Sequence, residues 1–522
     1  MRLIGFFLRR VLPLAAVIAL GIVLFSSPSS AASARTGEFG LDINALPDST
    51  LASPEQLGYI FANTGIGYVQ ATLNWSNIET SADAYNWAAV ADLDRLFQTA
   101  QAHDVKVIVV LTGGPVYLAT SGRSVDRAAF GERWEGFVRA AGNYFGASVD
   151  VWQIGSDINS NRGLSQFLNP LSPKDSLPPD PAYYTKLLHA AYQVLKDVDP
   201  TSQVWLGSLT GVAANNCAMN PLTFLLEVNA AKGWKYMDAI AYHPVRGALA
   251  PEVPLSVSSK SACSSNLMEK PVSISAEVRS VQDLTRQLGS KPVVITGLGW
   301  GNKSLQQLKE GRAITQAELE ADLLVRTSAA LMAENTPPVI IWNVDLNSNL
   351  HAFNALANLQ ASIANAASRG KMDGASGALH EYQFLKGDET YLLAWRSEEG
   401  DSAYPANIAA EKNDSLMLYP ADATRLSQEF GLNPQFSAPN QVTLMLNERP
   451  VIFYSRSHSL VKNVKLSLDD QLVTWKMDLK QAFQRQVNIL KAAMRNFFDD
   501  LFNRVKDSAI EWGEEKIEEL VH

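Results

Sequence analysis

This chain of 522 residues has few cysteines, and its basic residues do not outnumber its acidic ones. Its two cysteines, Cys217 and Cys263, have no second cysteine or histidine at the spacing that zinc sites use, so a metal site is not expected. Lysine and arginine number 44 against 53 aspartates and glutamates, and the formal net charge is -9. That balance offers no basic surface to nucleic acid. The sequence therefore predicts no metal, no cofactor and no nucleic-acid partner.

Long apolar runs are also scarce, and the clearest one lies near the N-terminus. Arg9 and Arg10 precede an apolar run over residues 11–25, and residues 32–34 have the small-x-small pattern at which signal peptidases cut. The run is shorter than the roughly 20 residues that span a bilayer. Residues 1–34 are therefore predicted to be a signal peptide or, if they are not cleaved, an N-terminal anchor. The rest of the protein is expected to be exported and to be secreted, periplasmic or associated with the cell envelope.

Export would place the two cysteines in an oxidising compartment. In an oxidising compartment an even number of cysteines favours a disulfide bond. Cys217 and Cys263 each lie in a polar stretch rich in serine or asparagine, and such loops need a covalent link. We therefore predict that Cys217 and Cys263 form a disulfide.

Residues 37–343 alternate between short β-rich runs and longer helical stretches. The runs are mostly continuous in valine and isoleucine, which is typical of parallel strands covered on both faces. They span 39–43, 67–73, 105–111, 149–154, 204–209, 239–242, 292–296 and 339–342, with helical patterns such as 90–102, 127–144, 183–198 and 319–333 between them. Eight such units predict an α/β fold, a (β/α)8 TIM barrel over residues 35–365. A doubly wound open sheet is the alternative, although no Gly-rich phosphate loop follows the first strand.

The pattern changes after a Ser/Ala/Gly-rich join at residues 366–377. Short strands are predicted at 380–384, 390–395, 415–419, 441–446 and 450–454, which indicates a small β-sandwich-like domain over 376–456. Apolar residues then repeat every three or four positions from Leu472 to Val505, which predicts a long amphipathic helical region over 459–522. A protein partner, a second copy of the chain, a membrane surface and the chain's own barrel are the alternatives for covering this apolar stripe.

Residues that could form a binding site lie at or just after the ends of several predicted strands. Because the C-terminal ends of the strands form one face of a barrel, these residues are expected to lie together. They are Trp75 and Glu79 after the second strand, Asp157 after the fourth, Tyr242 and His243 at the sixth, Gly297 and Trp300 at the seventh, and Trp342 and Asn343 at the eighth. Aromatic residues at four strand ends indicate a sugar platform, since pyranose rings pack their C–H faces on aromatic faces.

The order and spacing of these segments resemble the clan-A retaining glycoside hydrolases, particularly the xylosidase- and endoglucanase-like barrels. The resemblance covers about residues 41–343, and no single piece of it is specific. It rests on Trp75 with Ile78-Glu79, Tyr85-Asn86-Trp87, Tyr242-His243-Pro244, the Thr296-x-x-Gly299-Trp300 pattern and the final Trp342. What the resemblance implies is a (β/α)8 barrel, a carbohydrate ligand and glycosidase chemistry carried by two glutamates.

Both glutamate positions of that family are substituted in this chain. The acid/base position, an Asn-Glu in the family, is Ser156-Asp157 here, and the nucleophile position is Gly297. Gln70 stands where the family usually has an arginine. A retaining mechanism needs two carboxyl groups about 5–5.5 Å apart, and glycine has none. The sequence therefore predicts a glycan-binding or envelope assembly protein that keeps a hydrolase scaffold.

Two other functions stay open at this point. An active glycosidase could use Asp157 as the acid and Glu79 or Asp345 as the base, because an inverting site tolerates carboxyl groups about 6.5–9.5 Å apart. A structural scaffold could act through the C-terminal helical region. Single residues also have structural alternatives: Asp157 could pair with Arg162, Glu79 could belong to a turn, His243 could be a satisfied strand-end histidine, and the tryptophans could pack the barrel mouth.

Overall fold

The computed structural model describes residues 36–51, 53–119, 124–172, 176–211, 219–255, 272–372, 379–396, 404–409, 416–423, 435–438 and 441–455. All of them belong to the first of two compact units, Met1–Ser459, and the second unit is Leu460–His522. The predicted signal segment, the C-terminal helical region and both cysteines lie outside the described residues. The three predictions made for those parts therefore stay predictions.

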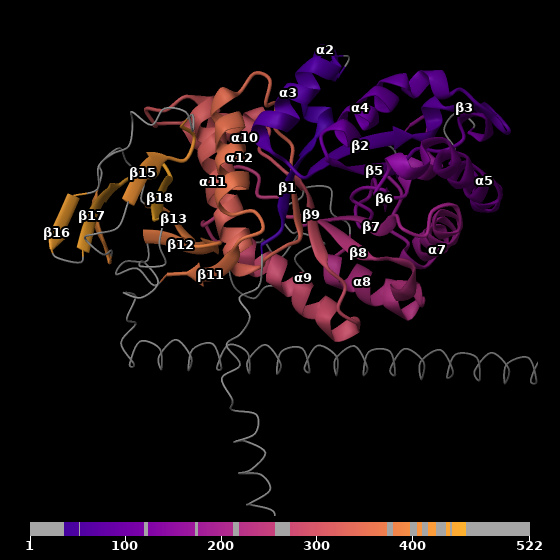
Figure 1. Ribbon diagram of the computed structural model, residues 1–522. Coiled ribbons are helices and arrows are strands. Elements are labelled where there is room, and N and C mark those ends of the chain that lie inside the picture. Colours follow the sequence, from indigo (N-terminus) through magenta and orange to yellow (C-terminus); the bar gives the residue numbers. More distant parts are fainter. Residues whose placement is uncertain are drawn as a thin grey trace, which may run out of the picture. The chain divides into compact units, whose positions relative to one another are not determined.

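A closed parallel barrel forms the centre of the described structure (Figure 1). The ring runs in the order β1-β10-β9-β8-β7-β6-β5-β2, and it closes because β1 pairs with both β10 and β2. The strands are β1 (Glu38–Asp42), β2 (Tyr68–Asn74), β5 (Lys106–Thr112), β6 (Val151–Ile154), β7 (Gln203–Thr210), β8 (Ala239–His243), β9 (Val293–Leu298) and β10 (Val339–Trp342). All eight predicted strands are confirmed, and the predicted fold class with them.

Helices surround the barrel strands (Figure 1). They are α2 (Asp48–Leu51), α3 (Pro54–Thr64), α4 (Ala91–Ala102), α5 (Arg127–Phe145), α6 (Ser165–Leu168), α7 (Pro181–Val198), α8 (Pro221–Ala230), α9 (Ile274–Leu288), α10 (Asn302–Lys309), α11 (Gln316–Glu334) and α12 (Leu350–Ser362). The four predicted helices are confirmed as α4, α5, α7 and α11. Capping side chains mark the starts of α5, α7 and α11: at α7 the Asp180 side chain accepts a hydrogen bond from the Tyr183 N–H, and Pro181 occupies the first turn.

The barrel interior is filled rather than hollow. Alternate residues of the barrel strands point inward and form one buried apolar cluster, made of Ile108, Val151, Trp205, Ala239, Ala241, Val294, Val339 and Ile341. The other face of each strand packs under the helices in a much larger cluster. Burial on both faces explains why the strand sequences are continuous apolar runs. The polar inward residues come above this apolar layer, at the C-terminal ends of the strands.

Two antiparallel sheets follow the barrel. A five-stranded sheet has the order β11-β12-β13-β18-β15, and a three-stranded sheet has the order β14-β17-β16. The strands are β11 (Ala367–Lys371), β12 (Leu379–Lys386), β13 (Glu389–Arg396), β14 (Tyr404–Ala409), β15 (Leu416–Pro420), β16 (Gln435–Ala438), β17 (Gln441–Leu446) and β18 (Val451–Ser455), and a small β3 (Glu79–Ser81)–β4 (Ala84–Tyr85) hairpin precedes α4. The five predicted strands are confirmed, but β11, β14 and β16 were not predicted.

The missed strand β11 shows what pattern reading overlooks. Its sequence has no apolar alternation, so it looks like part of the join between domains. It is a strand because it pairs with β12 and because Ser368 Oγ donates a hydrogen bond to the Ala333 carbonyl of α11 (2.8 Å). Figure 1 shows the five-stranded sheet beside α11. Tertiary pairing, not local sequence, makes this strand.

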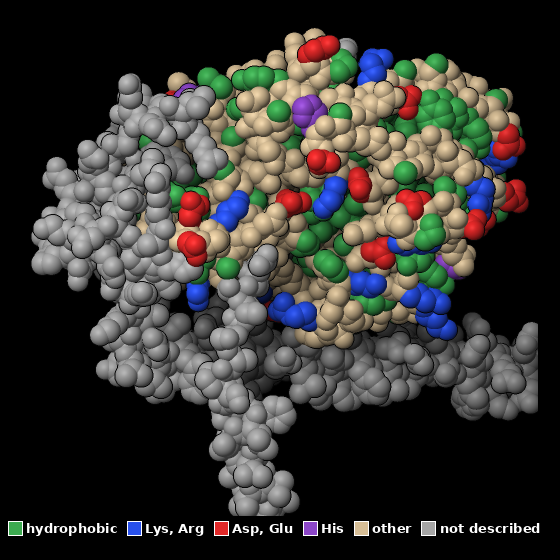
Figure 2. Space-filling view, in the orientation of Figure 1, with side chains coloured by type: hydrophobic (Ala, Val, Ile, Leu, Met, Phe, Trp, Pro, Cys, Tyr) green, Lys and Arg blue, Asp and Glu red, His purple; other side chains and the backbone are tan. Residues whose placement is uncertain are grey.

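The described surface carries mixed charge. In the view of Figure 2, acidic and basic side chains are interspersed over the barrel, and no extended patch of one sign is visible on that face. Among the described helices, none combines the length and the apolar character that crossing a membrane requires. Both observations concern the described part of the chain alone.

Glu381 of β12 gives the fold a pH dependence that can be measured. Its carboxyl is buried, and burial raises its pKa from 4.5 to about 7. The folded protein therefore binds more protons than the unfolded chain between these values, and stability should fall by up to about 3 kcal/mol as the pH rises from 4.5 through 7. Denaturant titrations of Glu381→Gln should show this decline removed. The exposed Asp388→Asn is the control, and an unchanged decline in Glu381→Gln contradicts the assignment.

Candidate functional site

One hydrogen-bonded network crosses the C-terminal mouth of the barrel. It joins residues that lie in or just after six strands, from Asp157 after β6 through His243 of β8 and Thr296 of β9 to Gln70 of β2. From Gln70 it continues to Asp42 of β1, which also accepts a hydrogen bond from Asn343 after β10. Active sites of this fold lie at this end, because the strand ends and their loops converge there. We call this set the mouth network.

Asp157 is the most accessible carboxylate of the mouth network. Its side chain is 34% exposed, and its Oδ1 lies 2.9 Å from His243 Nδ1. The backbone holds it in a left-handed conformation, with φ of 48°, and Ser208 Oγ accepts a hydrogen bond from its N–H (2.9 Å). Aspartate tolerates this conformation better than glutamate does. Arg162, one of the partners considered from the sequence, forms no ion pair with Asp157 in the described structure, and His243 takes that place.

His243 occupies the space beside Gly297, the residue at the position where the resemblance implies a nucleophile. Its Nε2 lies 3.1 Å from Thr296 Oγ1, so both ring nitrogens are engaged. A Cβ atom added to Gly297 would lie only 2.7 Å from His243 Nε2 and 2.8 Å from its Cδ2. Such distances are below van der Waals contact. A side chain at residue 297 and this position of the imidazole therefore exclude each other.

Gly297→Ala tests this exclusion directly. The added methyl group should push His243 away from Thr296 and lower the free energy of unfolding by about 1–3 kcal/mol, as overpacking does. The measurement is chemical denaturation together with the NMR signals of the His243 ring. Gly131→Ala is the matched control, because nothing lies within 4 Å of a Cβ there. Adding His243→Ala should relieve the destabilisation, and purely additive effects of the two changes contradict the proposed contact.

Asp42 forms the second carboxylate of the mouth network. Its Oδ1 accepts hydrogen bonds from Asn44 Nδ2 (2.7 Å) and the Asn44 N–H (3.0 Å), and its Oδ2 accepts from Asn343 Nδ2 (3.3 Å) and Gln70 Nε2 (3.5 Å). Burial raises the pKa of Asp42, while the hydrogen bonds from Asn44 and Asn343 and the nearby His243 act in the opposite direction. Unlike most buried carboxylates, it has no lysine or arginine partner among the described residues.

Trp75 and Glu79 lie in a separate, buried group. Trp75 Nε1 donates a hydrogen bond to Glu79 Oε2 (2.6 Å), and the Trp75 ring stacks on Phe137 at 4.6 Å between centroids. Glu79 Oε1 pairs with Arg133 (2.7 Å) and accepts from the Asp83 N–H (2.8 Å). Both residues are fully buried here, so neither presents a surface to a ligand. We do not carry them into the proposed binding surface.

Tyr242, Trp300 and Trp342 are also more buried than a sugar platform requires. The Tyr242 hydroxyl donates to Glu277 Oε1 of α9 (2.6 Å), and burial raises the pKa of this tyrosine well above its ordinary value. Trp300 and Trp342 stack on each other at 6.2 Å, and Trp300 Nε1 donates to the Leu249 carbonyl (3.3 Å). These contacts brace the loops after β8 and β9. Of the predicted site residues, the structure brings Asp157, His243, Gly297 and Asn343 to the mouth network.

Sequence reasoning missed Asp42 and assigned Gln70 and Thr296 to strands. Asp42 was hidden because the first strand was predicted to end at Ile43, one residue beyond its end in the structure. Asp42 is itself the last residue of β1, so the carboxylate lies at a strand end like the other site residues. The sequence identifies Gln70 and Thr296 less clearly as site residues than it identifies a strand-end carboxylate. A polar residue inside an otherwise apolar strand points either into a site or into an internal hydrogen-bond network.

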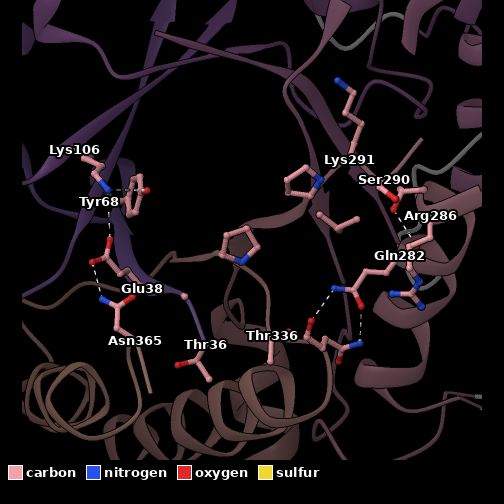
Figure 3. Close-up of a pocket in the computed structure, with 16 residues that line it drawn as sticks. Thr36, Glu38, Tyr68, Lys106, Gln282, Arg286, Ser290, Lys291, Thr336 and Asn365 are labelled. Atoms are coloured by element: carbon pink, nitrogen blue, oxygen red, sulfur yellow. Dashed lines mark hydrogen bonds and ion pairs between the residues drawn. The ribbon is translucent and has the colours of Figure 1, made fainter. Parts of the chain in front are cut away.

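A polar depression of about 780 Å³ lies at the opposite, N-terminal end of the barrel (Figure 3). Figure 3 shows Lys106 beside Tyr68 and Glu38, with Gln282 and Arg286 on the other side. Lys106 Nζ already contacts the Tyr68 hydroxyl (3.3 Å) and Glu38 (3.8 Å). Because this end of a TIM barrel serves stability rather than chemistry, we assign it no role in binding. Among the described residues no group of three or more histidine, cysteine or acidic side chains is placed to hold a metal ion.

Known structures resemble this fold, although the sequences differ widely. A family 39 glycoside hydrolase from Bacteroides cellulosilyticus WH2 has a TM-score of 0.58 at 14% identity, over 81% of this chain and 82% of that one. A family 30 subfamily 8 xylanase from Clostridium acetobutylicum has a TM-score of 0.53 at 12% identity, over 81% and 97%. A monomeric β-xylosidase from Caulobacter crescentus CB15 has a TM-score of 0.51 at 14% identity, over 81% and 96%.

These likenesses show that the chain shares its barrel fold with these proteins and nothing finer, because at such identities only the fold is shared. No family model matches the sequence, and no curated protein matches it either. Activity and ligand have to be argued from the residues at the barrel mouth.

Proposed function

We propose that this protein is an exported glycan-binding protein of the cell envelope that has no retaining glycosidase activity. The observation that carries the proposal is the contact between Gly297 and His243. A retaining enzyme needs a carboxylate that attacks the anomeric carbon, and here that position has no side chain. The imidazole of His243 fills the space where such a side chain would begin. What remains at the mouth is a set of polar groups suited to holding a ligand.

The alternative of an inverting enzyme is less well supported by the same geometry. That alternative needs a base, and the sequence offered Glu79 or Asp345. Glu79 is buried and paired with Arg133. Asp345 holds a turn, since its Oδ1 accepts from the Asn347 N–H (3.0 Å) and its Oδ2 from the Ser348 hydroxyl (2.6 Å). Neither carboxylate belongs to the hydrogen-bonded network that contains Asp157.

The location and partner of the protein are part of this proposal. Export rests on the signal-like residues 1–34, and association with a partner, a second copy or a membrane surface rests on the apolar stripe of residues 472–505. A chain truncated after residue 456 should keep its barrel and lose that association. Unfolding of the truncated chain shows instead that the stripe packs inside the molecule.

Binding without turnover is the expected result for the full-length protein. We expect a panel of oligosaccharides to include at least one that binds in calorimetry, and a panel of aryl glycosides to release no phenol. Asp157→Asn should weaken the binding, since it removes the accessible carboxylate of the mouth network. Cleavage with retention by the wild-type protein that disappears in Asp157→Asn overturns the proposal. Absence of any binding across the panel overturns it as well.

A further inference from the structure

The mouth network is rich in acceptors and poor in cations. Asp42 and Asp157 both contribute carboxylates, and neither forms an ion pair with a lysine or arginine in the described structure. The one basic side chain that the described network contains is His243. It hydrogen-bonds to Asp157, and its electrostatic interaction with Asp42 lowers the pKa of Asp42. Two carboxylates with no permanent cationic partner give this end of the barrel a negative potential.

Gln70 supplies a second and independent sign that a donor is missing. Its side chain is 5% exposed, and its Nε2 donates to Asp42 and to the Thr296 carbonyl (3.1 Å). Its Oε1 is buried and has no hydrogen-bond partner. Gln153 of β6 is 1% exposed and repeats the pattern, with Nε2 bonded to the Gly155 carbonyl and Oε1 without a partner. A buried acceptor without a donor is unfavourable by about 1–3 kcal/mol, so a ligand that donates a hydrogen bond to Gln70 Oε1 would remove this cost at the mouth network.

The network is open to a ligand on the Asp42 and Asp157 sides. Asn44, Thr72 and Asn343 surround Asp42 and are exposed, although Thr72 lies within a barrel strand. An exposed inward residue on β2 means that no described side chain covers the strand end there.

We infer that the mouth network binds a glycan whose sugars carry free amino groups, with the Asp42 and Asp157 carboxylates accepting hydrogen bonds from its ammonium and hydroxyl groups. This inference rests on the proposed glycan-binding function and names its ligand class. A protonated amine supplies three N–H donors together with the positive charge that no lysine or arginine of the described residues supplies to Asp42 and Asp157. An acetylated amine is neutral, with a single N–H, and a uronic acid adds a third negative charge.

Calorimetry of the full-length protein with three matched oligomers tests the inference. The probes are oligomers of glucosamine, N-acetylglucosamine and galacturonic acid of equal length, in mildly acidic buffer that keeps the amines protonated. We expect the glucosamine oligomer to bind about tenfold more tightly than the acetylated one, with added salt reducing the difference. Equal affinity for both, or a preference for the acidic oligomer, overturns the inference while the proposed function stands. No binding of any oligosaccharide overturns the proposed function itself.

Asp42→Asn and Asp157→Asn locate the preference within the site. Each should weaken the binding of the glucosamine oligomer severalfold more than it weakens the binding of the acetylated oligomer. Asp48→Asn is the matched control, because Asp48 is an exposed acid six residues after Asp42 and its loss changes the net charge by the same amount. Thermal melting of each variant confirms that the barrel is folded. An equal loss in Asp48→Asn shows that general charge attraction explains the preference and overturns the assignment to the mouth network.

Discussion

Replacing Glu252 with glutamine should lower the free energy of unfolding by about 3–5 kcal/mol, because it leaves a buried guanidinium without its counter-charge. Glu252 lies in the segment after β8 and forms a bidentate pair with Arg326 of α11, at 2.7 Å to Nε and 2.6 Å to NH2. Trp395 of β13 donates its Nε1 to the same carboxylate (2.7 Å). One buried carboxylate therefore ties together a loop of the barrel, an outer helix and the five-stranded sheet.

Burial alone would raise the pKa of Glu252, but the Arg326 guanidinium beside it brings the pKa below the ordinary value of 4.5. The pair therefore adds stability above that value, and this part is lost as the pH falls through the folded-state pKa. Glu252→Gln should abolish this acid sensitivity as well as the stability. Denaturant titrations at several pH values measure both effects.

Two variants separate the buried pair from ordinary surface charge. Asp197→Asn removes the partner of Arg139, an exposed pair with side chains 68% and 49% accessible, and should change stability by at most about 1 kcal/mol. The double variant Glu252→Leu, Arg326→Met removes both charges and should recover most of the lost stability. A double variant as unstable as the sum of the two single ones shows that packing, not the unpaired charge, causes the loss.

The barrel could be predicted from sequence because most residues of its strands are buried. Burial on both faces requires continuous valine and isoleucine runs such as Val107–Leu111. The strands β14 and β16 escaped prediction, as β11 did, because antiparallel strands that gain their order from a partner need no such run. The sequence predicts which strands exist better than it predicts where each strand ends. The first strand was predicted to end one residue after Asp42, so Asp42 was not recognised as a strand-end carboxylate.

The candidate site was predicted only in part, for a different reason. Residue type and strand position located Asp157 and His243 at the same end of the barrel, but they do not say which polar side chains face each other. Trp75 illustrates the limit. The sequence position of Trp75, just after a barrel strand, predicts a sugar platform. In the structure its indole N–H donates a hydrogen bond to Glu79, and its ring stacks on Phe137 inside the protein. Burial is decided by the helix that packs outside the strand, and a strand motif carries no information about that helix.

Glu79→Gln should lower the free energy of unfolding by about 3 kcal/mol, the loss expected when hydrogen bonds to a buried charged group are broken. The Glu79 carboxylate is fully buried and accepts from Trp75, Arg133, the Asp83 N–H and the Tyr117 hydroxyl. A glutamine amide cannot accept at both oxygen positions, so one donor must face another.

The same variant also tests the alternative in which Glu79 is a catalytic base. Asp83→Asn is the matched control: Asp83 binds the same Arg133 (2.7 Å) but is 71% exposed, so its loss should destabilise far less. Thermal melting, denaturant titration and sugar binding are measured on both variants and on the wild type. We expect Glu79→Gln to melt at a lower temperature while its folded fraction binds sugar with the wild-type affinity. If Glu79→Gln instead keeps full stability and loses an enzymatic turnover that the wild type shows, Glu79 is a base and its buried network has the functional role that we deny it.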